Sequence, residues 1–191
     1  MPIPYSETMR RLVLMRHAKT ERSNPDGDHA RVLMERGHSD SDLIAGWLAE
    51  NGIRPDLALV SDAARTRQTM AKLKPALAEG ADVRFSGSLY LAPPEAILHE
   101  IWATPANAET LLVVGHNPGI HELAFELAGS GERRLRSTLA GGFPTAALAV
   151  LDFDAPDWTG VAPGGGELKF CVTAKSLREG TGQALGSGHA G

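Results

Sequence analysis

Two histidines and two arginines follow short apolar runs of the sequence, where an α/β fold would bring them together: they are Arg16, His17, Arg65 and His116. Guanidinium groups bind phosphate oxygens through paired hydrogen bonds, and a helix that begins nearby adds backbone N–H donors. An imidazole can attack phosphorus when a hydrogen bond at its other nitrogen fixes its tautomer. Together these four side chains could bind a phosphoryl group and accept it on a histidine, and that step needs no metal ion or cofactor.

Each of these residues has a plainer explanation when it is taken alone. A histidine after a strand is more often a structural residue, and an arginine early in a helix is usually solvated. Arg65 also opposes the helix dipole, which disfavours a cation near a helix N-terminus unless an anion receives it. We favour the functional interpretation because ligands of open α/β sheets bind beyond the carboxyl ends of the strands, and three such ends deliver these groups.

The elements that would position this cluster follow from the alternation of short apolar runs with longer amphipathic segments. Such alternation is typical of an α/β fold with a mostly parallel sheet and helices on both faces. Strands are expected at 12–15, 57–60, 82–85 and 111–114, and helices at about 39–50, 61–79, 93–101 and 119–128. Ser61 or Asp62 can cap the second helix, and Pro75 can end it early.

The C-terminal part of the chain is expected to complete the sheet. Apolar runs at 146–153 and 168–173 have no crossover helix between them, so we expect an antiparallel pair at one edge, with 163–166 near its turn. The segment 180–191 is rich in Gly, Ser and Ala with little to bury, which predicts a flexible tail. The sequence thus predicts a single three-layer α/β/α domain over residues 1–179.

Length and composition limit the classes of protein to which this chain can belong. A chain of 191 residues, 42% hydrophobic and 22% charged, fits one globular domain. Its net charge of -4 argues against general binding of nucleic acid, and no stretch reaches the ~20 apolar residues of a membrane span. With the single cysteine Cys171 and no signal-peptide pattern at the start, the expected compartment is the cytoplasm.

Three segments of the sequence resemble the motifs of one enzyme family. The segment 14–20 resembles the signature of the histidine phosphatase (phosphoglycerate mutase-like) superfamily, 61–69 its second motif and 114–117 its third. The alanine after His17, the short chain and the Gly-His-Asn-Pro-Gly form of the third motif are similar to the SixA-type branch of phosphohistidine phosphatases. The resemblance implies a phosphoglycerate mutase-like fold and a metal-independent phosphatase whose nucleophile is His17.

The same resemblance implies roles for the residues around the nucleophile. Arg16, Arg65 and His116 would bind the phosphoryl group and stabilise the charge that develops on its oxygens. Thr20 and Asn117 are further candidates for contact with the substrate. The implied substrate is a phosphohistidine on a signalling or phosphotransfer protein.

The acid that would protonate a leaving group is the open point of this assignment. Members of the broader family supply a carboxylic acid after the third strand, and the carboxyl group nearest that place is Glu95. The helix dipole explains a glutamate in a first turn equally well. A phosphoramidate needs such an acid less, because a protonated imidazole leaves more easily than an alkoxide. Two alternatives therefore stay open: a phosphatase of small phosphate esters, and a module that binds a phosphorylated partner without turnover.

Overall fold

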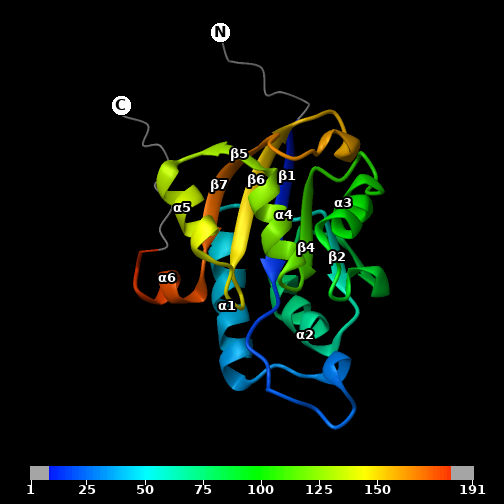
Figure 1. The fold of residues 1–191 in the computed structure, drawn as a ribbon, viewed down its shortest axis with the longest axis vertical. Helices are drawn as coiled ribbons and strands as arrows, with labels where there is room; N and C mark the ends of the chain where they lie inside the picture. Colours follow the sequence, from blue (N-terminus) through cyan, green and yellow to red (C-terminus); the bar gives the residue numbers. More distant parts are fainter. Residues whose placement is uncertain (1–8, 182–191) are drawn as a thin grey trace.

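The computed structural model describes residues 9–181, which form a seven-stranded sheet with helices on both faces (Figure 1). The strands are β1 (Met9–Arg16), β2 (Leu57–Ser61), β3 (Asp82–Ser86), β4 (Thr110–Gly115), β5 (Ala128–Gly131), β6 (Leu148–Asp154) and β7 (Gly166–Val172). Their order is β3-β2-β4-β1-β6-β7-β5. β3, β2, β4 and β1 are parallel, whereas β6 runs antiparallel to both β1 and β7. The predicted α/β fold and its antiparallel pair are confirmed.

Three helices cover each face of this sheet. The helices are α1 (Glu35–Glu50), α2 (Ala64–Leu73), α3 (Pro94–Trp102), α4 (Gly119–Leu127), α5 (Arg133–Gly141) and α6 (Ala174–Arg178). Buried side chains of α1, α2 and α6 share one hydrophobic cluster, and those of α3, α4 and α5 share another. Single 3-10 turns occur at η1 (Asp28–Ala30), η2 (Lys74–Ala76), η3 (Gly87–Leu89) and η4 (Trp158–Gly160). Among residues 9–181, no helix is long and apolar enough to cross a membrane.

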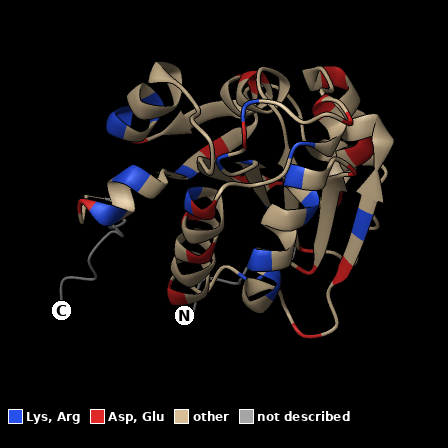
Figure 2. Cartoon of the chain, turned by 90° about the horizontal axis from the view of Figure 1, so that it is seen from below, with Lys and Arg blue, Asp and Glu red and all other residues tan. Residues whose placement is uncertain are grey.

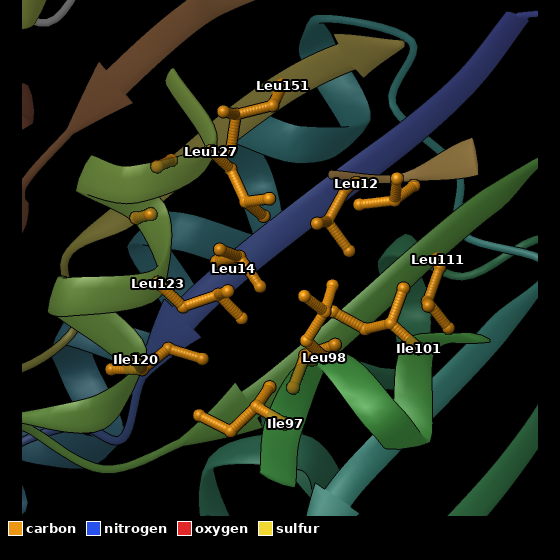
Figure 3. Close-up of a cluster of buried hydrophobic side chains, with 14 of the residues drawn as sticks. Leu12, Leu14, Ile97, Leu98, Ile101, Leu111, Ile120, Leu123, Leu127 and Leu151 are labelled. Carbon is orange, nitrogen blue, oxygen red and sulfur yellow. The ribbon is translucent and has the colours of Figure 1, made fainter. Parts of the chain in front are cut away.

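The central strand β1 contributes to both clusters, which explains its continuous apolar sequence. Leu12 and Leu14 pack on the side of α3 and α4 (Figure 3), and Val13 and Met15 pack on the side of α1 and α2. All four side chains are fully buried. Burial of a side chain of this size stabilises the fold by about 1.5–3 kcal/mol. Because both faces of the sheet are covered, a parallel strand here carries no polar alternation.

The structure differs from the predicted elements in several places. α1 begins at Glu35 rather than at about 39, and α2 ends at Leu73, where η2 follows with Pro75 near its start. β5 and α5 were not predicted, because the sequence of β5 is Ala-Gly-Ser-Gly and α5 buries only Leu139. β5 pairs with β7 and lies beyond the antiparallel pair. The predicted tail lies outside the described residues from 182 onward.

Candidate active site

Strand register brings the two histidines of the predicted cluster to one edge of the sheet. β1 and β4 are parallel neighbours in which Arg16 lies opposite Gly115, so His17 and His116 follow at the same level. The centroids of their rings are 5.3 Å apart. β2 ends beside β4 and leads into α2, whose first turn carries Arg65. The three strand ends thus deliver both imidazoles and Arg65 to one place.

A cavity of about 340 Å³ opens at this edge of the sheet. Besides His17, the sequence-predicted residues that line it are Arg16, Thr20, Arg65, His116 and Asn117. Its charged lining comprises one acidic residue, Asp28, and the basic residues Arg16, Lys19, Arg22, Arg31 and Arg65. Figure 2 shows both signs of charge on the helices: α2, α5 and α6 carry Lys or Arg without Asp or Glu, whereas α3 and α4 carry Glu without Lys or Arg. Because the net charge of the chain is -4, the strongly positive lining is a local property of the cavity, and it suits an anion.

The hydrogen bond of His17 assigns its tautomer. Its Nδ1 lies 2.8 Å from the carbonyl oxygen of Ala18. A carbonyl oxygen can only accept, so Nδ1 carries the proton and Nε2 carries a lone pair. Burial, and then the positive charges of nearby arginines including Arg65, lower the pKa of His17 to about 4. The imidazole is therefore neutral at pH 7 and can act as a nucleophile through Nε2.

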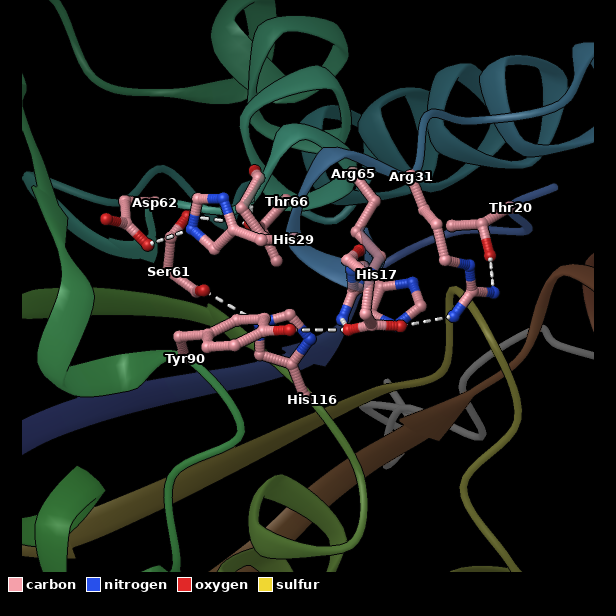
Figure 4. A network of polar contacts seen from close by, with 12 residues as sticks. His17, Thr20, His29, Arg31, Ser61, Asp62, Arg65, Thr66, Tyr90 and His116 are labelled. Carbon is pink, nitrogen blue, oxygen red and sulfur yellow. Dashed lines mark hydrogen bonds and ion pairs between the residues drawn. The ribbon is translucent and has the colours of Figure 1, made fainter. Parts of the chain in front are cut away.

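The second histidine is also neutral but is held differently. Burial, followed by repulsion from His17 once that ring is protonated and from Arg65, lowers the pKa of His116 to about 3. Its Nε2 lies 2.7 Å from the hydroxyl oxygen of Ser61, the last residue of β2 (Figure 4). Its Nδ1 is buried and has no hydrogen-bond partner among residues 9–181. His116 lines the cavity, so one nitrogen of a cavity residue has no partner among the described residues.

Two predicted arginines are close enough to influence each other. Burial, and then the positive charge of Arg65, lower the pKa of Arg16. The Nε atoms of both are buried without a hydrogen-bond partner in the part of the chain that the structure describes. Arg65 is only 2% exposed. Cations that repel each other and have buried donors left over gain most from a bound anion.

Asp28 and Arg31 also line the cavity, although neither was among the site residues predicted from the sequence. The Asp28 carboxylate accepts from the Tyr90 hydroxyl at 2.6 Å and lies 2.9 Å from Arg31 and 3.0 Å from Arg65. Hydrogen bonds from Tyr90 and Arg31 hold the pKa of Asp28 well below its usual range. A negative group is thus already bound to two of the guanidinium groups that line the cavity. In the sequence, only the i, i+3 spacing of Asp28 and Arg31 hinted at this pair.

Thr20 and Asn117 line the cavity beside its arginines. The Thr20 hydroxyl oxygen accepts from Nη2 of Arg31 at 2.6 Å. Asn117 Nδ2 donates to the carbonyl of Phe143 at 2.7 Å, and Nη1 of Arg16 donates to the same oxygen at 3.2 Å. Thr20 therefore contacts an arginine of the cavity directly, whereas Asn117 and Arg16 donate to the same carbonyl oxygen.

One side chain of α2 links the residue after His17 to Arg65. The Thr69 hydroxyl donates to the carbonyl of Arg65 at 2.8 Å, and its oxygen accepts the N–H of Ala18 at 3.1 Å. Thr69 is fully buried, so this link is shielded from water. Thr69 therefore connects Ala18, the residue after His17, to the helix that carries Arg65.

The remaining predicted residue, Glu95, does not join the cluster. Glu95 is exposed in the first turn of α3 and is not among the residues that line the cavity. The carboxylate that the fold does place in the cavity is that of Asp28. No group of three His, Cys, Asp or Glu residues within 9–181 is arranged to hold a metal ion.

Comparisons with known proteins match these observations. The model of the histidine phosphatase superfamily (branch 1) matches residues 12–87. An uncharacterised protein of Mycobacterium tuberculosis is 40% identical over 154 residues, which span 78% of this chain and 93% of that protein. The SixA structure from Nakamurella multipartita is 32% identical with a TM-score of 0.72, covering 86% of this chain and 95% of its own. That from Agrobacterium tumefaciens is 37% identical with a TM-score of 0.67, covering 75% and 92%. With its motifs and fold in agreement, the chain belongs to branch 1 of the histidine phosphatase superfamily, among proteins of the SixA type.

Proposed function

We propose that this phosphatase removes the phosphoryl group from phosphohistidine in a protein, through a covalent intermediate on His17. The observation that carries the proposal is the state of His17. Its Nδ1 proton is committed to the carbonyl of Ala18, and its neutral Nε2 belongs to a cavity with a strongly basic lining. A lone pair beside fixed donors for phosphate oxygens is what attack on phosphorus requires.

Two transfers would complete the reaction. First, Nε2 of His17 forms a bond to phosphorus while the P–N bond of the substrate breaks, and the departing imidazole takes up a proton from solvent. Then water attacks phosphorus, the bond to His17 breaks, and phosphate leaves with one proton released. Arg16, Arg65 and His116 would stabilise the equatorial oxygens in both steps. Neither step draws on a metal ion or a cofactor.

The carboxyl groups near the cavity favour phosphohistidine over an ester. An alkoxide leaving group needs a protonated acid nearby, whereas an imidazole can leave with a solvent proton. Asp28 is ionised, because its hydrogen bonds hold its pKa below the usual range, and Glu95 lies outside the lining. The related structures from Nakamurella and Agrobacterium both carry the name phosphohistidine phosphatase, which supports the same substrate class.

The test is release of inorganic phosphate from a phosphohistidine-bearing protein in the presence of a chelator. The native enzyme should release phosphate, His17→Ala should not, and His99→Ala should behave as the native enzyme because His99 is exposed on α3. Release from small esters but not from phosphohistidine would replace the proposal by an ester phosphatase. Tight binding of the phosphorylated protein, without release and unchanged in His17→Ala, would instead indicate a recognition module.

A further inference from the structure

The hydroxyl of Ser61 has an unexpected partner. The sequence predicted that Ser61 or Asp62 caps α2, but neither does: the N-cap is Ala63, and no side chain bonds to the first turn there. The hydroxyl of Thr66 turns back to the carbonyls of Ser61 and Ala63 instead. Ser61 is fully buried, and its hydroxyl oxygen lies 2.7 Å from Nε2 of His116.

One direction of this hydrogen bond leaves fewer buried polar groups unpaired than the other. If Nε2 of His116 donated, the buried hydroxyl proton of Ser61 would need another acceptor, and residues 9–181 offer it no second hydrogen bond. Leaving a buried hydroxyl proton without an acceptor is costly. If Ser61 donates, Nε2 accepts and the single proton of the neutral imidazole lies on Nδ1. That nitrogen is the one without a protein partner.

We propose that Ser61 is a positioning residue whose hydroxyl donates to Nε2 of His116, fixes the Nδ1–H tautomer and so presents a hydrogen-bond donor to the phosphoryl group. Figure 4 shows Ser61 and His17 on opposite sides of the His116 ring. His17 commits its N–H to the carbonyl of Ala18 and presents a lone pair. In the proposed tautomer, Nε2 of His116 accepts from Ser61, and Nδ1–H is left to donate. The same neutral tautomer thus serves a nucleophile in one histidine and an anion donor in the other.

The tautomer itself can be observed in the native protein. In protein with ¹⁵N-labelled histidine, two-bond ¹H–¹⁵N correlation spectra at neutral pH distinguish a protonated Nδ1 from a protonated Nε2. We expect His116 in the Nδ1–H form, with and without inorganic phosphate, and a gain of the Nε2–H form in Ser61→Ala. Assignment comes from the signals that vanish in His116→Ala. An Nε2–H form of His116 in the native protein would overturn the proposal without any variant of Ser61.

Binding of inorganic phosphate tests the consequence. Ser61→Ala should weaken binding about 10-fold, the size expected for loss of one hydrogen bond to a charged group. Ser61→Thr keeps the hydroxyl and should restore most of the affinity. Ser41→Ala is the matched control, since it removes another fully buried hydroxyl, one that donates to the carbonyl of Gly37 in α1, and should not change binding.

A double-mutant cycle separates positioning from a general structural effect. If Ser61 acts through the imidazole, adding Ser61→Ala to His116→Ala should weaken phosphate binding no further. An equal loss in both backgrounds would refute the proposal, and so would unchanged binding in Ser61→Ala. The inference rests on the proposed function only in requiring a phosphoryl group in the cavity. Because tautomer and phosphate affinity are read without turnover, failure of phosphohistidine hydrolysis would leave these tests intact.

Discussion

Acidification should destabilise the fold through His17, and the size of the effect follows from its burial. The pKa of His17 is 6.5 as a model value and about 4 in the folded protein. As the pH falls below 6.5, the unfolded state therefore binds a proton that the folded state does not, and the free energy of unfolding decreases. The decrease stops near pH 4, where the folded state is protonated too. It amounts to about 3 kcal/mol, since each pH unit in this window contributes about 1.4 kcal/mol.

Urea unfolding between pH 7 and pH 4 measures this contribution. His17→Asn removes the titrating group, while its amide can still donate to the carbonyl of Ala18. The native protein should lose about 3 kcal/mol more stability over this range than the variant does. His99→Asn, on the exposed surface of α3, should follow the native protein. Equal losses in the native protein and in His17→Asn would refute the reasoning, because they would mean that His17 takes up its proton as readily in the folded state.

Three other substitutions probe the cavity and its supports. Arg65→Lys should weaken inorganic phosphate binding about 10- to 100-fold by calorimetry, since an ammonium cannot replace a buried bidentate guanidinium; native affinity would remove Arg65 from the binding site. Glu95→Gln should leave turnover unchanged in a phosphate-release assay, because Glu95 lies outside the cavity lining; loss of ester hydrolysis would restore it as the acid. Gly119→Ala should lower the free energy of unfolding, measured by urea unfolding, by roughly 1–3 kcal/mol. The reason is that a Cβ at this position would lie 1.9 Å from the carbonyl oxygen of Ala92. Unchanged stability would contradict that packing.

Local sequence patterns were sufficient to predict the central sheet and the groups that follow the ends of its strands. Continuous apolar runs such as 12–15 and 111–114 report burial on both faces, and parallel strands have their carboxyl ends at one edge. That rule placed His17 beside His116 without any knowledge of the packing. β5 and α5 escaped prediction because they bury few side chains and so leave no periodic signal.

The sequence by itself determined the fold class and singled out His17 as the proposed nucleophile, with Arg16 and Arg65 as the proposed phosphate-binding arginines, because strand burial and motif spacing are local features of the chain. Only the tertiary structure decided which partners those groups have. Asp28 meets Tyr90 across 62 positions, and His116 meets Ser61 across 55. Polar contacts of this kind depend on how loops and strand ends pack, and no periodicity in the chain records them. The protonation state of each histidine is set by those partners and by burial, and it therefore belongs to the folded molecule alone.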